Sequence, residues 1–301
     1  MQKEKLYREI KSNPVVRLLV KPFRKIEQDY AHIKYIKSGE NKRIQRFKDM
    51  FVGETCYIIG NGPSLRINDL ERIGSNYSFG SNGIHQLFSK TDWRPTFYTC
   101  YDVEDISENR KRLSKIDAKY IIIDFKAKRI IKDDIDNIYY FYSKFHFPIN
   151  KYDPIYPFIS ENVSDCVSDG QTITFINIQL AFYMGFKTIY LLGIDHNYSR
   201  IIHRDGTVEN NIEVQNYSDD LVDDGLGVQF VDNTTEAYEE ARKYAENKGI
   251  KILNATRGGK LEVFPRVEFD RLTHNYNTSS ARSLEIKSRL SPKMSNEYGN
   301  Y

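Results

Sequence analysis

Residues 172–195 limit what this chain can fold into more than any other part of the sequence. They begin with TITFINIQLAFYMG, which is apolar on nearly every face and is therefore typical of a helix buried between two layers. Gly185 predicts the end of that helix. The run that follows, KTIYLLGID, is nearly continuous in its apolar character, as expected of a strand covered on both faces. The stretch therefore predicts a central strand of a parallel sheet.

Other segments continue this alternation of buried strands with helices or turns. Short runs of strand-forming residues occur at 56–60 (CYIIG), 77–82 (YSFGSN), 95–102 (PTFYTCYD), 119–125 (KYIIIDF), 138–143 (IYYFYS) and 250–256 (IKILNAT). A helix is predicted at 234–249, starting near Thr234 or Thr235 and ending at Gly249. The pattern predicts a Rossmann-like α/β domain over residues 51–272, with a doubly wound, mostly parallel sheet.

The ends of the chain differ in composition from this domain. Residues 1–50 hold 14 Lys or Arg and 6 Asp or Glu, a net charge of +8, whereas the whole chain carries +3. We expect a short basic amphipathic stretch there, interrupted by Pro22. It could dock on an anionic membrane surface or pack on the domain as a solvated helix. Residues 273–301 are low in hydrophobics and predict a flexible tail, while 146–169 and 196–232 predict a loop and a mobile polar stretch.

Composition excludes several classes of protein. The near balance of 44 Lys or Arg against 41 Asp or Glu gives no support to a dedicated nucleic-acid binder. No apolar run approaches the ~18–20 residues of a membrane-spanning helix, and the N-terminus lacks the apolar region of a signal peptide. We therefore expect a cytoplasmic protein, peripheral at most to the inner membrane face. Cys56, Cys100 and Cys166 have no metal-binding or disulfide spacing, so we expect reduced thiols and no metal site.

Ligands of open α/β sheets bind beyond the carboxyl ends of the strands, and one such loop follows the first predicted strand. It contains Gly60, Asn61, Gly62 and Ser64, with Ser64 as the expected cap of the next helix. Its backbone N–H groups could receive a phosphate, and the carboxamide of Asn61 could bind a phosphate, a ribose hydroxyl or a base edge. The loop matches neither of the common nucleotide-binding glycine motifs, so a purely structural turn stays open.

Further polar residues follow the other strands and point towards the same crevice. Asn82 ends the second strand, and Thr99 and Asp102 end the third. Arg257 follows the last strand and could contact an anionic ligand. Each of the first three residues alone could equally be a cap or a turn residue, and Arg257 could equally form salt bridges in a solvated loop. Only their convergence indicates a site.

The strongest acid–base candidates follow the strand at 187–195. There Asp195 stands beside His196, and a carboxylate next to an imidazole can orient a hydroxyl or relay a proton. His203 lies further along the same loop and is a weaker candidate, because a histidine among surface charges is common.

The combination of GNGPSL, FGSNGIHQLF, FYTCYD, the run at 169–198 and ILNATRGGKLEVFPRVEFDRL resembles one family over residues 52–272. It is the 6-hydroxymethylpterin pyrophosphokinase-like (DUF115-type) domain of archaeal pterin kinases, flagellin-glycosylation motility accessory factors and proteins of surface-polysaccharide loci. More distantly, the chain is similar to bacterial sialyltransferases that use CMP-sialic acid and a variant GT-A fold.

The sialyltransferase resemblance implies that Asn61 and Asn82 contact the nucleotide, and both match that family's asparagines. Thr99 stands where the family has a third asparagine, and Tyr198 is the one residue near its phosphate-assisting tyrosines. The catalytic histidine of that family has no counterpart, because Phe230-Val231-Asp232 occupies its place. Transfer of sialic acid itself is therefore not expected.

Three functions compete. The first is a glycosyltransferase of surface-glycan assembly that takes a nucleotide-activated donor and a glycan or lipid-linked acceptor, with His196 or His203 as base and no cofactor. The second is pyrophosphoryl transfer from ATP to a pterin alcohol, with Mg²⁺ held by Asp102 and Asp195. The third is a non-catalytic protein that binds a nucleotide or a glycan.

Overall fold

The structure, a computed structural model, describes residues 14–101, 116–131, 135–144, 157–203, 207–211, 213–214 and 228–272. Asp102 and the tail at 273–301 lie outside the described residues, so the expectations for them are not addressed. The chain divides into two compact units, Met1–Val267 and Glu268–Tyr301. In the second unit the described residues end in a helical turn at 269–272, and Arg271 pairs with Glu268 at 2.5 Å.

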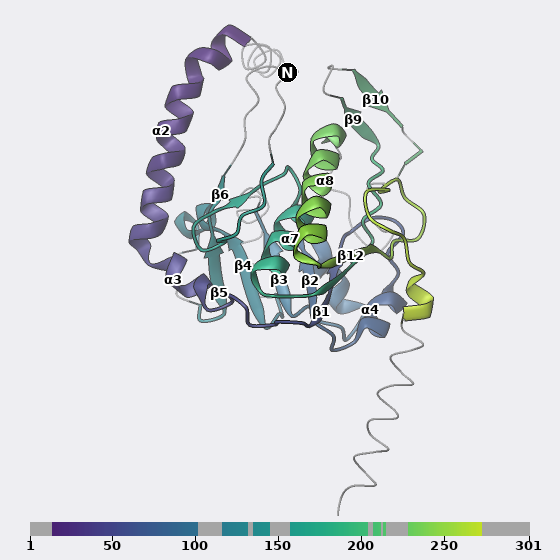
Figure 1. Ribbon diagram of the computed structural model, residues 1–301. Helices are drawn as coiled ribbons and strands as arrows, with labels where there is room; N and C mark the ends of the chain where they lie inside the picture. Colours follow the sequence, from purple (N-terminus) through teal and green to yellow (C-terminus); the bar gives the residue numbers. More distant parts are fainter. Residues whose placement is uncertain are drawn as a thin grey trace, which may run out of the picture. The chain divides into compact units, whose positions relative to one another are not determined.

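A seven-stranded parallel sheet forms the centre of the first unit, in the order β12-β8-β1-β2-β3-β4-β5 (Figure 1). The chain builds outward from β1 to β5, then returns to place β8 on the other side of β1 and β12 beyond it. The strand order therefore reverses between β1 and β8, which confirms the doubly wound α/β fold. The strands are β1 (Thr55–Ile59), β2 (Ser78–Ser81), β3 (Phe97–Cys100), β4 (Tyr120–Asp124), β5 (Ile138–Phe141), β8 (Thr188–Leu192) and β12 (Lys251–Asn254).

Two helices cover one face of the sheet, α7 (Ile173–Tyr183) and α8 (Val231–Lys248), drawn in front of it in Figure 1. Helix α7 is buried along its length, as its unbroken apolar sequence predicts, and the Thr172 hydroxyl caps its start. Helix α8 ends at Gly249, whose φ of 63° suits glycine. It begins at Val231, slightly before the expected Thr234 or Thr235.

The helix after β1 does not start where the sequence suggests. Helix α4 (Ile67–Ile73) has Arg66 as its N-cap, and the Arg66 N–H donates to the Asp69 carboxylate at 3.1 Å. The expectation that Ser64 caps this helix is wrong, because the Ser64 hydroxyl bonds elsewhere. Two 3₁₀ helices, η1 (Asn82–Ser89) and η2 (Phe125–Arg129), follow β2 and β4.

The polar stretch between β8 and α8 contains short strands that the sequence did not predict. Its described part contains a small three-stranded sheet of β9 (Arg200–Ile202), β10 (Val208–Asn210) and β11 (Val228–Gln229). Short β-branched pairs such as Ile201-Ile202 supply the strands. Within the expected loop at 146–169, β7 (Val167–Ser168) pairs with β6 (Ser143–Lys144).

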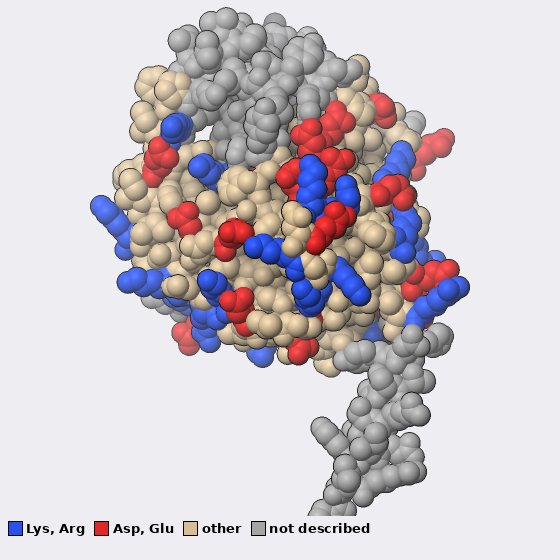
Figure 2. Space-filling view, in the orientation of Figure 1, with Lys and Arg blue, Asp and Glu red and all other residues tan. Residues whose placement is uncertain are grey.

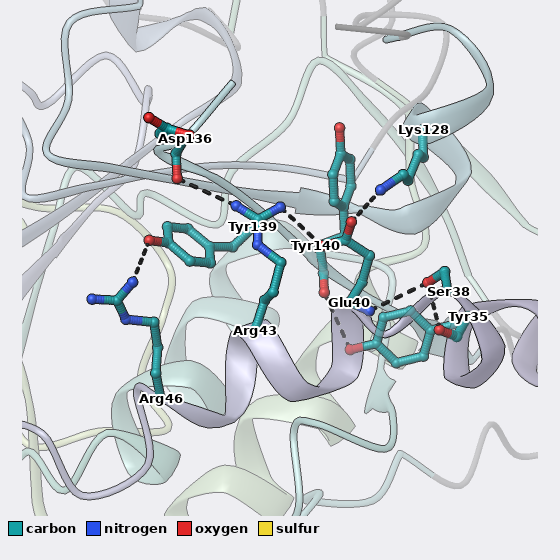
Figure 3. A network of polar contacts seen from close by, with 9 residues as sticks. All are labelled: Tyr35, Ser38, Glu40, Arg43, Arg46, Lys128, Asp136, Tyr139 and Tyr140. Atoms are coloured by element: carbon teal, nitrogen blue, oxygen red, sulfur yellow. Dashed lines mark hydrogen bonds and ion pairs between the residues drawn. The ribbon is translucent and has the colours of Figure 1, made fainter. Parts of the chain in front are cut away.

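The N-terminal segment is a long helix rather than a short interrupted stretch. Helix α2 (Pro14–Ser38) runs through Pro22, and α3 (Glu40–Gln45) follows it. Figure 3 shows how this segment is joined to β5 and η2: the Tyr35 hydroxyl donates to the Tyr140 carbonyl of β5 at 3.1 Å, and Glu40 pairs with Lys128 of η2.

The hydrophobic core extends into this N-terminal segment. Ile44 and Phe47 are both fully buried in it, and the Phe47 ring packs edge-on to Tyr139 at 4.8 Å. A domain boundary at residue 50 therefore does not separate the core from what precedes it. Of the two readings of this segment, packing on the domain describes residues 28–47. Among the described residues, no helix has the length and apolar character needed to cross a bilayer.

Candidate functional site

The carboxyl ends of β1 and β8 meet at the point where the strand order reverses. The Gly60 N–H donates to the Leu192 carbonyl at 2.8 Å, and the Gly62 N–H donates to the Gly193 carbonyl at 3.0 Å. Neither glycine leaves room for a side chain: a Cβ on Gly60 would lie 2.3 Å from the Gly193 oxygen, and one on Gly62 would lie 2.0 Å from the Asp195 carboxylate. The glycines are therefore required by this close approach of two loops.

Asp195 ties the two loops together. Its Oδ2 accepts the Ser64 hydroxyl at 2.8 Å and the Ser64 N–H at 3.3 Å. The side chain is buried, and burial raises the pKa of this carboxyl above its usual value. The N–H groups of Gly60, Gly62 and Ser64 are thus all used inside the protein, so the expected phosphate cradle is not open in this arrangement.

Two side-chain oxygens at this edge have no partner. Asn61 Nδ2 donates to the Ser81 carbonyl at 3.1 Å, which holds the Asn61 carboxamide next to Asn82. The Oδ1 atoms of Asn61 and Asn82 are both buried, and neither has a hydrogen-bond partner in the described part of the chain. Asn82 has a φ of 50°, a left-handed conformation that asparagine tolerates better than most residues. Unpaired buried acceptors are costly, and a bound water molecule or a ligand can supply the missing donor.

The Thr99 side chain forms hydrogen bonds within the protein interior. It is fully buried, its hydroxyl donates to Asn177 Oδ1 at 2.8 Å, and it lies 2.8 Å from the Ser81 hydroxyl. Asn177 Nδ2 closes the triangle by donating to Ser81 Oγ at 2.8 Å. This group fastens α7 to β2 and β3, and in this arrangement the Thr99 hydroxyl offers nothing to a ligand.

Arg257 is also committed within the protein. Its guanidinium makes two bonds to the Asp69 carboxylate, at 2.6 and 2.8 Å, and Asp69 is almost completely buried. The pair joins the loop after β12 to α4. Its charge is therefore neutralised by Asp69, which weakens the expectation that it binds an anionic ligand.

His196 follows Asp195 and is 7% exposed, with a left-handed φ of 51°. Its Nε2 lies 2.9 Å from the Thr235 hydroxyl, whose hydrogen is donated to the Val231 carbonyl at 2.8 Å. Because that hydrogen is already used, Nε2 must be the donor to Thr235. Nδ1 is then the acceptor, and it is buried without a partner among the described residues. Burial lowers the pKa of His196 to about 4, so the ring is neutral at pH 7.

A cavity of about 890 Å³, the α8 groove, starts at His196 and runs between α8 and the segment after β12. In Figure 2 acidic and basic side chains are interspersed over α8, so no single charge dominates this face. Arg242 pairs with Glu246 at 3.0 Å, and Arg266 pairs with Glu262. The lining residues are His196, Thr235, Glu239, Arg242, Glu246, Lys260, Leu261, Glu262, Val263, Phe264, Pro265 and Arg266.

The remaining expected residues are only partly brought together. The Tyr198 ring lies edge-on to His196, with centroids 5.9 Å apart. His203 lies at the end of β9 between Glu209 and Asp232, 2.9 and 3.4 Å away, and hydrogen bonds to these carboxylates raise its pKa. It does not line the α8 groove.

Three polar residues were missed by sequence reasoning. Thr235 was read only as a helix start, although its place one turn into α8 sets the tautomer of His196. The Oδ1 of Asn197 is another buried oxygen without a partner among the described residues. Both carboxylate oxygens of Asp169 are also buried without a hydrogen-bond partner among the described residues, and burial raises the pKa of Asp169 to about 7. The SDG turn before α7 was the available signal for Asp169.

Of the two carboxylates expected to hold magnesium in the pyrophosphokinase reading, Asp195 lies within the described residues and Asp102 lies outside them. One oxygen of Asp195 is occupied by two donors from Ser64, and the carboxyl is buried with a raised pKa, which opposes binding of a cation. No group of three or more His, Cys, Asp or Glu within the described ranges could hold a metal ion.

Comparison with solved structures finds similar backbones at low identity. A MAf glycosyltransferase from Magnetospirillum magneticum AMB-1 is 15% identical, with a TM-score of 0.46, over 82% of this chain and 42% of that one. The chain thus spans less than half of that protein. The sialyltransferase CstII from Campylobacter jejuni, solved with cytidine-5'-monophosphate, is 15% identical over 72% of this chain and 85% of that one, with a TM-score of 0.45. Similarity of this degree leaves activity open.

Comparison by sequence gives a clearer result for the family. No curated protein matches the chain. Residues 30–200, however, match the family described as 6-hydroxymethylpterin diphosphokinase MptE-like. The match covers more than half of the chain, and it starts within α2, in agreement with a core that includes Ile44 and Phe47. The resemblance inferred from the sequence motifs is confirmed, and the chain belongs to the MptE-like family.

Proposed function

We propose that this chain is a nucleotide-dependent transferase that passes the sugar of a nucleotide-activated donor to a hydroxyl of a glycan or lipid-linked acceptor. The observation that carries the proposal is the pair of buried, unpartnered carboxamide oxygens of Asn61 and Asn82. They lie at the carboxyl edge of the sheet beside the reversal of strand order, where open α/β sheets bind their ligands. Membership of a family named for a diphosphokinase agrees with a substrate that carries phosphates.

The chemistry of these two atoms narrows the part of the donor that they bind. Both are acceptors, so they need a partner that donates a hydrogen bond. A ribose hydroxyl or a base amino group does so, whereas an ionised phosphate does not. We therefore assign the Asn61 and Asn82 oxygens to the nucleoside of the donor.

The α8 groove takes the acceptor, with His196 among its lining residues. Nδ1 receives the proton of the acceptor hydroxyl while that oxygen forms a bond to the anomeric carbon. The bond from this carbon to the donor phosphate breaks, and the nucleotide leaves with the electron pair. The pKa of about 4 makes the free imidazole a weak base, and the negative charge of a bound donor raises it.

We place the protein in the cytoplasm, at the inner face of the membrane. The cations of residues 1–21 would contact the anionic lipids there, because lipid-linked acceptors lie at that surface. The alternative is a pyrophosphokinase that uses ATP with Mg²⁺, favoured by the name of the family. A non-catalytic member that binds a nucleotide is the third reading.

Thermal shift with CMP, UDP, GDP, ADP and ATP, each with and without Mg²⁺, tests these readings. A ligand at 100 times its dissociation constant stabilises by about 2.7 kcal/mol. We expect metal-independent stabilisation by one of the pyrimidine or guanine nucleotides. Stabilisation by ATP only with Mg²⁺ would support the pyrophosphokinase, and binding without turnover of any sugar donor would support the non-catalytic reading.

Substitutions at Asn61 and Asn82 test whether their side-chain oxygens bind the nucleotide. Asn61→Ala and Asn82→Gly should weaken binding by about 1.5–3 kcal/mol, or roughly tenfold to a hundredfold. Glycine is chosen at Asn82 because it keeps the left-handed backbone. The matched control is Asn137→Ala, which removes a similar amide-to-carbonyl bond of 3.2 Å, to Ala118, at the amino end of β5. Equal affinity in all three variants would remove the nucleotide from this edge.

A further inference from the structure

Helix α2 carries an apolar stripe that its own domain does not cover. Phe23, Ile26, Tyr30 and Ile33 are 72, 65, 69 and 50% exposed. Their spacing of three, four and three residues is that of the a and d positions of a two-stranded coiled coil. In the sequence the same spacing continues towards the N-terminus with Leu19 and Val16. We call the four described residues the α2 stripe.

The opposite side of α2 is held against the domain. The Tyr142 hydroxyl donates to the Gln28 carbonyl at 2.8 Å, His32 pairs with Asp165 at 2.9 Å, and Tyr35 is fully buried. At 3.6 residues per turn, positions 28, 32 and 35 share one side, and the α2 stripe lies on the other. Figure 3 shows the bond from the Tyr35 hydroxyl to the Tyr140 carbonyl of β5. The helix is thus fixed with its apolar side outward.

We propose that the α2 stripe binds the same stripe of a second copy of this chain, as an antiparallel pair of helices. The charges beside the stripe favour this occupant over an anionic membrane. Glu27 and Lys34 flank it on one side and Asp29 on the other, all exposed. Both carboxylates would face anionic headgroups unfavourably, whereas a second copy offers Lys34 to Glu27.

The antiparallel direction follows from the same positions. Glu27 and Lys34 both occupy the e position, and e positions meet each other when two helices pack antiparallel, which gives two opposite-charge pairs. Parallel packing would instead set Lys37, which continues the a positions after Tyr30, against its own copy. Antiparallel packing avoids that repulsion.

Analytical ultracentrifugation of the full chain over a wide concentration range tests the proposal. We expect a reversible dimer for the wild type, and Ile26→Glu should weaken it by about tenfold or more. The matched control is Val52→Glu, which places the same charge at another exposed apolar residue, 69% exposed, away from the stripe. It should dimerise as the wild type does. A wild type that stays monomeric, or equal dimerisation by Ile26→Glu, would overturn the proposal.

Exchanging the charges of Glu27 and Lys34 tests whether two copies pair through these residues and whether their helices are antiparallel. Glu27→Lys should weaken the dimer, because it sets two lysines together, and Glu27→Lys with Lys34→Glu should restore it. Failure of the double variant to recover would overturn the antiparallel pairing. Flotation with phosphatidylserine–phosphatidylcholine vesicles tests whether the α2 stripe binds an anionic membrane instead. A monomeric wild type that floats, with flotation lost in Ile26→Glu, would assign the stripe to the membrane and overturn the proposal.

Discussion

At the scale of single residues, His196 and Asp169 give the protein opposite responses to acid. The pKa of His196 is lowered to about 4 from an unfolded value of about 6.5, so the unfolded chain takes up its proton first as the pH falls. Stability from this group is therefore lost between about pH 6.5 and 4, by about 2 kcal/mol at pH ~4.5. His196→Asn should abolish that loss in urea unfolding series, since asparagine accepts the left-handed backbone.

Asp169 has the opposite effect on the pH dependence of stability. Its pKa is raised to about 7, so its contribution to stability is present in acid and declines as the pH rises from about 4 to about 7. Asp169→Asn should consequently make the acid loss of stability steeper than in the wild type. Parallel pH profiles for the wild type and both variants would show that neither group is buried as described.

Residue types at strand ends could be predicted from the sequence, but their partners could not. Asn61, Asn82, Asp195 and His196 were identified because they follow strands. That Asp195 bonds Ser64, 131 positions away, follows only from the close contact of the two loops. In the same way the sequence leaves open whether Arg257 binds an anion or forms a salt bridge, because no spacing rule connects it to Asp69, 188 positions away.

At the scale of elements, the joint between the loops after β1 and β8 can be tested with one methyl group. Gly62→Ala would set a Cβ 2.0 Å from the Asp195 carboxylate, so it should destabilise the fold by about 1–3 kcal/mol and weaken nucleotide binding. Neither effect comes from a positive φ, since Gly62 has none.

Gly83→Ala is the control for that substitution. Its Cβ would meet only the flexible end of Gln86, at 3.3 Å, so its stability should stay within about 0.5 kcal/mol of the wild type. If Gly62→Ala and Gly83→Ala melt alike, the loops after β1 and β8 are not packed as closely as described.

The long apolar elements were predictable because an unbroken apolar run indicates burial on every face. Helix α7 and strand β8 follow from unbroken apolar runs, and the parallel order follows from their alternation with helices. Strands β9, β10 and β11 were not predicted, because a strand of two or three residues is too short to show an alternating pattern in the sequence. Pro22 predicts an interruption in the N-terminal stretch, but α2 runs through it, and the contacts of residues 28–35 with the domain override that local preference.

At the scale of the whole molecule, the N-terminal segment contributes to the folded core. Phe47→Ala should lower the free energy of unfolding by about 3–5 kcal/mol, because the ring is fully buried among Phe97, Tyr120 and Tyr139. Removal of residues 1–50 should be more damaging still. Chemical unfolding measures both, with Val52→Ala, at an exposed residue, as the control. Unchanged stability in Phe47→Ala would detach the segment from the core.

The position of β1 in the sheet also has a consequence for how the chain is made. Strand β1 pairs with β2 on one side, but its other neighbour, β8, begins only at Thr188. During synthesis at about 5–20 residues per second, roughly ten seconds pass between the completion of β1 and that of β8. Throughout this interval the nascent chain presents an unpaired, apolar strand edge, the kind of surface that templates aggregation. The reversal in strand order thus sets an interval in synthesis during which one edge of β1 lacks its neighbour.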